Sequence, residues 1–197
     1  MGHAHGGEVC ALAANSDLLK CGVQGGFALL HQRRFLRPCG LRFFRHSLGG
    51  HNAALDQLAS ASDVPLDAAK LGAIGFCFGG ATALELARSG ADIAGVVSFH
   101  GNLGTDLPAR SGEVKAKVLA INGGDDQYVP AEQINAFTRE MAGAGVDWQF
   151  VNLGGAVHCF AEADAQSPPG CVYNERAAKR AFRMMRTFFA EAFAAQD

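Results

Sequence analysis

The chain has 197 residues, enough for one domain with a sizeable hydrophobic core. Its 49% hydrophobic and 18% charged residues are ordinary for a soluble globular protein, and its net charge is only −2. No apolar run approaches the ~20 residues of a membrane span and no signal peptide is visible, so we expect a soluble, cytoplasmic protein.

The first 50 residues differ in character from the rest. Residues 1–50 carry six basic and two acidic side chains, whereas residues 51–197 carry 11 basic and 17 acidic ones. Half of the six cysteines (Cys10, Cys21 and Cys39) also lie in this segment, which shows no strand–helix alternation. We therefore divide the chain into an atypical basic, cysteine-rich segment, 1–50, and a main domain, 51–197.

Three explanations for residues 1–50 remain open. A frameshifted or misassembled start is favoured, because charge sign, cysteine density and hydrophobic pattern change together near Gly49. A genuine replacement segment is the second. The third is an arm that binds nucleic acid or membranes, since arginines alternate there with phenylalanines. We do not expect nucleic acid to be a partner.

From residue 52 onward, apolar runs predict alternating helices and strands. In chain order we expect a helix over 53–59, a strand over 71–75, a helix ending near 88, a strand over 93–99, a strand over 118–121, a helix from Pro130 to Gly143 or Gly145, a strand over 148–153 and a final helix around 178–192. Strands such as Ile93–Phe99 are apolar on both faces, which is typical of a parallel sheet covered on both sides. The sequence thus predicts an α/β fold, a three-layer sandwich with a mostly parallel sheet.

A G-x-C-x-G pentapeptide, Gly75 to Gly79, lies between a predicted strand and a predicted helix. Such an elbow exposes its central residue, here Cys77, at the start of a helix, where the dipole favours a thiolate. The glycines are needed because a β-carbon would clash with the neighbouring strand or helix. The N–H of Phe78 would point to a developing oxyanion. A buried structural cysteine is the alternative interpretation.

A thiol nucleophile needs a base, and the base needs an orienting acid. His158 follows the last predicted strand, and Asp125 and Asp126 follow the strand before it. Because parallel strands end at one edge of the sheet, all of these residues are expected near Cys77. Either aspartate could instead only shape its turn.

The remaining candidates are weaker. His100 ends the 93–99 strand, so we interpret it as a pocket-lining or structural residue, together with Phe76 and Phe160. The six cysteines show no C-x-x-C and no paired spacing, which predicts free thiols in a reducing compartment and no structural zinc site. A thiol redox sensor at Cys77 would need a resolving cysteine, and Cys159 is the only candidate nearby.

Four motifs together resemble the dienelactone hydrolase family of the α/β-hydrolase superfamily: GFCFGG at 75–80, SFHG at 98–101, GGDDQYVP at 123–130 and GGAVHCF at 154–160. The resemblance covers about residues 52–197. It implies Cys77 as nucleophile, His158 as base and Asp126 as acid, since the family's acid stands four residues before the proline of its loop, here Pro130. It implies hydrolysis of a carboxylic ester or lactone through a thiol-ester acyl-enzyme, with no metal or organic cofactor, in a monomer or dimer.

The chain departs from the family before the elbow. Members have several early strands, and a segment resembling HEIFG that supplies a glutamate and a second oxyanion-hole N–H. No such segment occurs here, so we expect the early strands to be lacking. A non-catalytic hydrolase-fold protein with an incomplete oxyanion hole is therefore the alternative to an active hydrolase.

Overall fold

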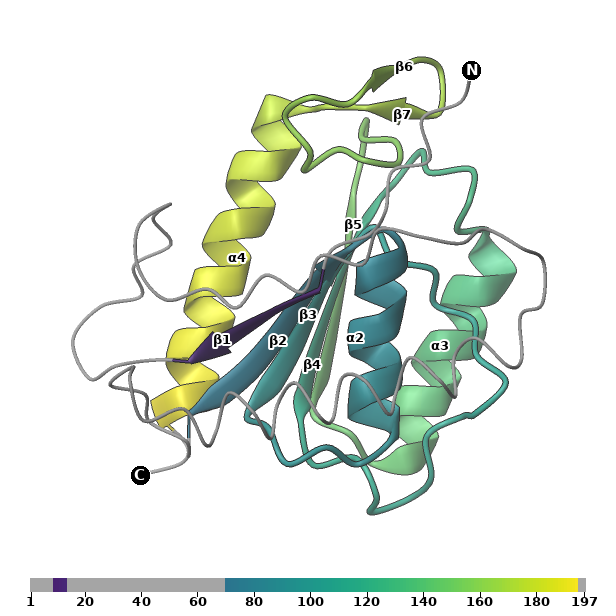
Figure 1. Cartoon of the computed structure of the whole chain (residues 1–197). Coiled ribbons are helices and arrows are strands. Elements are labelled where there is room, and N and C mark those ends of the chain that lie inside the picture. Colours follow the sequence, from purple (N-terminus) through teal and green to yellow (C-terminus); the bar gives the residue numbers. More distant parts are fainter. Residues whose placement is uncertain (1–8, 14–69, 195–197) are drawn as a thin grey trace, which may run out of the picture.

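A five-stranded sheet forms the centre of the computed structural model, which describes residues 9–13 and 70–194 (Figure 1). Its order is β1-β2-β3-β4-β5, and β2 to β5 run parallel while β1 pairs antiparallel with β2. The strands are β1 Val9–Ala13, β2 Leu71–Phe76, β3 Gly95–Phe99, β4 Lys117–Gly123 and β5 Trp148–Leu153.

Helices cover both faces of this sheet, which confirms the predicted three-layer sandwich. Helices α2 (Phe78–Arg88) and α3 (Ala131–Ala144) lie on one face, and α4 (Glu175–Ala194) lies on the other (Figure 1). Pro130 is the N-cap of α3 rather than its first helical residue, and Gly145 ends that helix in the left-handed conformation. A hairpin of β6 (Gln166–Ser167) and β7 (Cys171–Val172) precedes α4.

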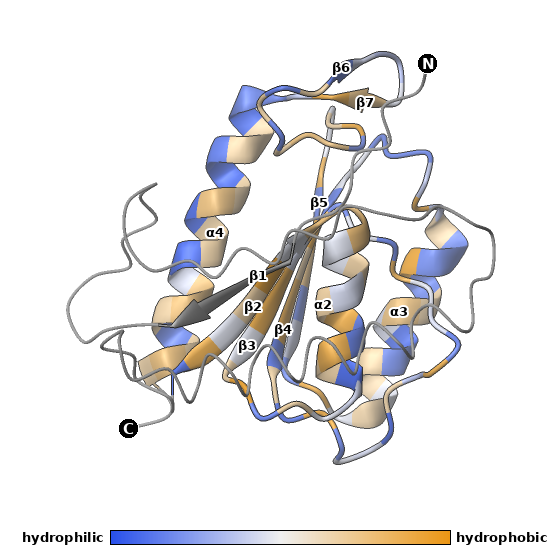
Figure 2. Ribbon diagram, in the orientation of Figure 1, coloured by the Kyte–Doolittle hydropathy of each residue, from blue (hydrophilic) through white to orange (hydrophobic). Residues whose placement is uncertain are grey.

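The core follows from the apolar pattern of the strands. Every residue of β3 is buried, as expected of a central parallel strand, and the strands are among the most hydrophobic elements in Figure 2. Helix α4 turns one face inward, and its arginines Arg180, Arg183 and Arg186 are exposed, as the sequence predicted. No helix of the described residues is long and apolar enough to cross a membrane.

Two glycines set how closely α4 approaches the sheet. A β-carbon at Gly72 in β2 would lie 2.4 Å from the ring of Phe189, and one at Gly95 in β3 would lie 2.9 Å from the ring of Phe188. Both distances are shorter than any van der Waals contact allows. The two phenylalanine rings of α4 therefore occupy the space that side chains would fill at these positions.

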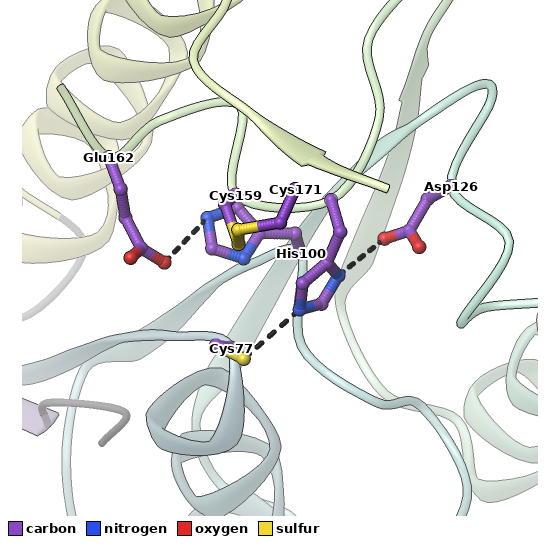
Figure 3. Close-up of a disulfide and its surroundings, with 7 residues drawn as sticks. Cys77, His100, Asp126, Cys159, Glu162 and Cys171 are labelled. Carbon is purple, nitrogen blue, oxygen red and sulfur yellow. Dashed lines mark hydrogen bonds and ion pairs between the residues drawn. A yellow bond between two sulfur atoms is a disulfide. The ribbon is translucent and has the colours of Figure 1, made fainter. Parts of the chain in front are cut away.

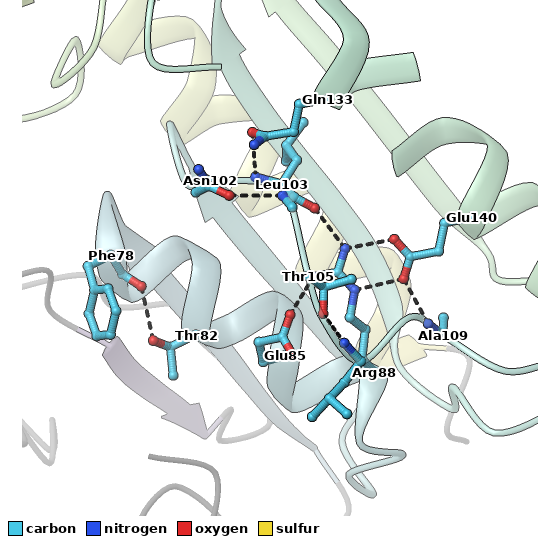
Figure 4. Close-up of polar contacts among 12 residues, drawn as sticks. Phe78, Thr82, Glu85, Arg88, Asn102, Leu103, Thr105, Ala109, Gln133 and Glu140 are labelled. Carbon is cyan, nitrogen blue, oxygen red and sulfur yellow. Dashed lines mark hydrogen bonds and ion pairs between the residues drawn. The ribbon is translucent and has the colours of Figure 1, made fainter. Parts of the chain in front are cut away.

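A buried guanidinium ties α2 to α3 and to the chain after β3 (Figure 4). Arg88 donates to Glu85 at 2.7 Å, to both carboxylate oxygens of Glu140 at 2.8 Å, and to the carbonyl of Leu103 at 2.9 Å. The N–H of Ala109 also donates to Glu140. The buried guanidinium of Arg88 is thus paired with two carboxylates, which offsets the cost of removing these charges from water.

Strand β1 was not predicted. Five residues, Val9–Ala13, carry little periodicity, and their place in the sheet depends on pairing with β2 about 60 residues later. The sequence of residues 1–50 shows no strand–helix alternation, and the structure nevertheless contains this one strand among the residues of that segment that it describes. The predicted helix over 53–59 and the remainder of the first 50 residues lie outside the described part of the chain.

Candidate active site

The turn between β2 and α2 places Cys77 in a strained conformation, with φ of 53°. Its N–H donates to the carbonyl of Phe99 at 3.0 Å, which ties the turn to the neighbouring strand. A β-carbon at Gly75 would lie 2.1 Å from the carbonyl oxygen of Gly79. The glycine is therefore required by the close approach of strand and helix, as the pentapeptide predicted.

The turn brings Cys77 to His158, although 81 residues separate them. The Sγ atom of Cys77 lies 3.0 Å from Nε2 of His158, and Nδ1 of His158 lies 2.8 Å from Oδ2 of Asp126 (Figure 3). Because a carboxylate only accepts, Nδ1 carries a proton and donates it to Asp126. This hydrogen bond leaves Nε2 of His158 to face the sulfur.

Asp126, rather than the exposed Asp125, is the carboxylate that reaches the histidine. Its side chain is fully buried, and its second oxygen accepts the N–H of Tyr128 at 2.8 Å. Both carboxylate oxygens are thus held by donors, which fixes the side chain in one orientation. The ring of Tyr128 also packs edge-on against His158, with centroids 5.0 Å apart.

The electrostatics of His158 favour the charged ring. Burial lowers its pKa, but the hydrogen bonds to Asp126 and Cys77 outweigh burial and raise the pKa to about 9. The imidazole therefore keeps a proton at neutral pH. Because Nδ1 donates to Asp126, the second proton of the charged ring is on Nε2, which faces the sulfur.

A second histidine lies beside this pair. His100 is fully buried, at a backbone φ of 39°, and its ring packs edge-on against His158 with centroids 5.0 Å apart. Neither ring nitrogen makes a hydrogen bond, and the nearest charged group is Glu162, 3.6 Å from Nε2. Burial, together with the charge of His158, lowers the pKa of His100 to about 3, so this ring is neutral.

The other sequence candidates surround this group at different depths. Phe76 is half-buried and stacks on Phe99 at 4.7 Å, whereas Phe160 is fully buried and packs edge-on against His100 at 5.2 Å. In this conformation Phe160 and His100 belong to the core beneath the site rather than to an exposed pocket wall. Phe78 is the first residue of α2, directly after Cys77, and it is 39% exposed.

The prediction of free thiols is wrong for two cysteines. Cys159 and Cys171 form a disulfide, with Cα atoms 5.0 Å apart (Figure 3). The two cysteines are 12 positions apart in the sequence, and the hairpin β6–β7 folds the chain back so that they come into contact. The only sequence signal was the position of Cys159 beside His158. Among the described side chains, Cys77 is the free cysteine.

The disulfide closes the loop that directly follows His158. Cys159 follows the histidine directly, His158 forms a bridge with Cys171, and the N–H of Val172 donates to the carbonyl of His158 at 3.1 Å. The histidine is therefore anchored on its backbone as well as through its ring.

One group of side chains in the described residues has the donor set of a metal site. Cys77, His100 and His158 each offer one ligand atom, and these atoms lie within 4.8 Å of one another. A thiolate and two imidazoles are ligands that zinc prefers.

Comparisons with known proteins show which proteins this chain is similar to. The model of the dienelactone hydrolase family matches residues 42–193. An uncharacterized protein of Caenorhabditis elegans is 37% identical over 147 residues, which are 72% of this chain and 91% of that protein. A protein of Salmonella typhimurium with the name "Putative carboxymethylenebutenolidase" is 30% identical over 148 residues, which are 71% of this chain and 53% of that protein. The chain thus spans about half the length of this relative.

The chain is also similar to a protein of known structure. A dienelactone hydrolase-like promiscuous phosphotriesterase from metagenomic libraries is 34% identical, with a TM-score of 0.66. The match covers 85% of this chain and 74% of that one.

Proposed function

Because this chain belongs to the dienelactone hydrolase family, we propose that it hydrolyses carboxylic esters or lactones, with Cys77 as nucleophile, His158 as base and Asp126 as orienting acid. The observation that carries the proposal is the continuous line of contacts from sulfur to imidazole to buried carboxylate, at 3.0 and 2.8 Å. Each of its three members stands just past the carboxyl end of a parallel strand.

In the first half of the reaction, the sulfur of Cys77 attacks the carbonyl carbon of the substrate. The carbonyl oxygen becomes an oxyanion, and the N–H of Phe78, the first residue of α2, is our proposed donor to it. Collapse of the tetrahedral intermediate breaks the bond to the leaving oxygen. His158 protonates that oxygen from Nε2, and a thiol-ester remains on Cys77.

In the second half, water releases the acid. Acylation of Cys77 removes its charge and its hydrogen bond to His158, two of the causes that raise the pKa of the ring. His158, which is neutral after giving its proton to the leaving oxygen, is then reprotonated less readily by solvent and takes a proton from an attacking water molecule. The water oxygen joins the acyl carbon, the carbon–sulfur bond breaks, and the carboxylic acid leaves.

The test is turnover of p-nitrophenyl acetate and of a dienelactone by the purified full chain. Cys77→Ser and His158→Ala are the paired variants, because each removes one reacting group. We expect both to lose activity by about 10³-fold or more. The matched control replaces Cys10, Cys21 and Cys39 with serine, which changes three other cysteines and keeps the nucleophile.

Equal residual rates in the wild type and both variants would overturn the proposal. That result would support the alternative, a hydrolase-fold protein without catalysis. Mass spectrometry after a brief incubation with the acetate ester separates the two halves of the mechanism. An acetyl adduct on Cys77 without turnover would mean that acylation occurs and hydrolysis of the thiol-ester fails.

A further inference from the structure

His100 has no part in the hydrolysis described above, yet its ring lies at the site. It is completely buried and makes no hydrogen bond through either nitrogen. Buried imidazoles almost always have a partner, because an unsatisfied polar atom costs about 1–3 kcal/mol. An orphaned histidine beside a thiol and a second histidine therefore requires a ligand or another explanation.

Each of the two histidines has a carboxylate near one of its ring nitrogens. Asp126 lies at Nδ1 of His158, and Glu162 lies 3.6 Å from Nε2 of His100. In metal sites, the ring nitrogen that does not bind the metal usually donates to a carboxylate, which orients the ring. The carboxylates therefore leave Nε2 of His158 and Nδ1 of His100 as the nitrogens that could bind a metal; Figure 3 shows Glu162 beside His100.

One nitrogen of each histidine lies near the sulfur of Cys77. Nε2 of His158 lies 3.0 Å from the sulfur, and the ligand atoms of all three side chains lie within 4.8 Å of one another. Zinc binds sulfur at about 2.3 Å and imidazole nitrogen at about 2.0–2.1 Å, so its tetrahedral ligands stand roughly 3–4 Å apart. A small inward movement of the His100 ring would complete this spacing.

We propose that Cys77, His158 and His100 form a binding site for a thiophilic divalent cation of the zinc type, overlapping the reacting atoms. The fourth coordination position is left for water, as in other three-ligand sites. Binding displaces the proton shared by Cys77 and His158 to solvent, and His100 contributes a lone pair without losing a proton. The cation thus occupies the sulfur and the base together, so binding and ester hydrolysis exclude each other.

Cobalt is the probe of choice, because Co²⁺ takes the same geometry and its bond to a thiolate gives a charge-transfer absorption. The full chain, stripped with EDTA and desalted, is titrated with Co²⁺ and then with Zn²⁺ by competition. We expect the near-ultraviolet thiolate band together with the intense visible bands of tetrahedral cobalt. Zn²⁺ should remove both and should inhibit ester hydrolysis over the same concentration range.

His100→Phe is the diagnostic variant, because it keeps a ring in the core but removes both nitrogens. We expect it to weaken Zn²⁺ binding at least about tenfold, since even loss of an outer partner of a ligand typically costs that much. Glu162→Gln should weaken binding less than His100→Phe does. Thermal melting in EDTA checks that both variants remain folded.

The other thiols provide the control. Replacing Cys10, Cys21 and Cys39 together with serine should leave the cobalt spectrum unchanged, whereas Cys77→Ser should abolish the thiolate band. Two results would overturn the proposal: no thiolate band in the wild type, or equal Zn²⁺ affinity in the wild type and His100→Phe. The second would mean that Cys77 and His158 hold the cation alone. Because cobalt binding is read from absorption, it is scored even if the chain hydrolyses no ester.

Discussion

The carboxylate of Asp126 lies 2.8 Å from Nδ1 of His158 and is fully shielded from solvent. A buried carboxylate at this nitrogen fixes the tautomer of the ring, because Nδ1 must donate and Nε2 must face the sulfur. The contact connects two loops that follow neighbouring strands, β4 and β5. Its consequences can be measured separately for the reaction, for the pKa and for the stability of the fold.

Asp126→Asn keeps the shape of the side chain but replaces the acceptor that fixes the tautomer. If the proposed mechanism holds, we expect kcat for p-nitrophenyl acetate to fall by on the order of 10³–10⁴-fold. Because Asp126 also stabilises the charged His158 ring, the variant should melt at a lower temperature than the wild type, and kcat is measured below that melting transition. Asp125→Asn is the matched control, because its neighbouring carboxylate is exposed and makes no contact with His158. A similar loss in both variants would contradict the assignment of Asp126.

The titration of His158 gives a second prediction. In buffer with EDTA, we expect NMR of its ring protons to show a pKa near 9, raised above the ordinary 6.5. The rise comes from Asp126 and Cys77 against the opposing effect of burial, so Cys77→Ser and Asp126→Asn should each lower it. A titration near 6.5 in the wild type would show that the thiol and carboxylate do not stabilise the charged ring.

The same shift predicts how stability depends on pH. The folded chain binds this proton more tightly than the unfolded chain, whose histidine titrates at its ordinary pKa. The stabilisation from His158 is therefore complete below about pH 6.5 and is lost as the pH rises through about 9. Denaturant unfolding between about pH 6 and 10 should show a steeper loss in the wild type than in His158→Ala.

The two glycine positions Gly75 and Gly143 give opposite predictions for the same substitution. Gly75→Ala places a β-carbon 2.1 Å from the Gly79 carbonyl oxygen, so we expect a cost of about 2–4 kcal/mol in the free energy of unfolding. Gly143→Ala lies in α3 with nothing within 4 Å, so we expect a gain of about 0.5–1 kcal/mol. Urea unfolding measures both, and a neutral Gly75→Ala would rule out the close approach at the elbow.

The disulfide should contribute both stability and order to the histidine loop. It closes a loop across 12 positions, so Cys171→Ser should lower the free energy of unfolding by about 3 kcal/mol in the chain-entropy view. Because His158 directly precedes Cys159 and its backbone pairs with Cys171 and Val172, hydrolysis should also fall. Cys159→Ser and the double variant should match Cys171→Ser, and a reducing agent should have no further effect on any of them.

The buried Arg88 network offers a prediction away from the site. Arg88→Met leaves the carboxylates of Glu85 and Glu140 without their cation, so we expect a loss of about 3–5 kcal/mol in unfolding free energy. Arg110→Met is the control, because the pair of Arg110 and Glu113 is exposed and should contribute less than about 1 kcal/mol. An equal loss of unfolding free energy in Arg88→Met and Arg110→Met would mean that burial does not determine how much an ion pair stabilises the fold.

The elements that carry a strong local pattern were predictable. The parallel strands, α2, α3 and α4 follow from apolar runs and helical spacing, and the turn at Cys77 follows from glycines that the close approach requires. The order of nucleophile, acid and histidine along the chain was enough to expect the three side chains at one sheet edge. Asp126 was preferred to Asp125 by resemblance to the family, and the structure brings Asp126 to the histidine.

The features that depend on long-range packing were not predictable. The pairing of Cys159 with Cys171 depends on a short hairpin, and the addition of β1 to the sheet depends on backbone hydrogen bonds that leave no side-chain signature. The complete burial of His100 results from neighbours on two separate segments, Phe76 at the end of β2 and His158 and Phe160 in the connection after β5. A strand-end histidine in the sequence gives no indication of how deeply the fold encloses it.

The two phenylalanine rings of α4 that fill the glycine positions of β2 and β3 prevent the helix from sliding along the sheet. The connection from Leu153 to Glu175 is thus fixed at both ends, and its length sets where His158 stands. Insertions or deletions there would move the imidazole away from the sulfur. The exposed turn around Gly112 lies between β3 and β4 and has no such constraint, because a β-carbon at this glycine would meet nothing within 4 Å. Insertions and deletions near Gly112 should therefore leave the site intact, whereas those between β5 and α4 should disrupt the contact of His158 with Cys77.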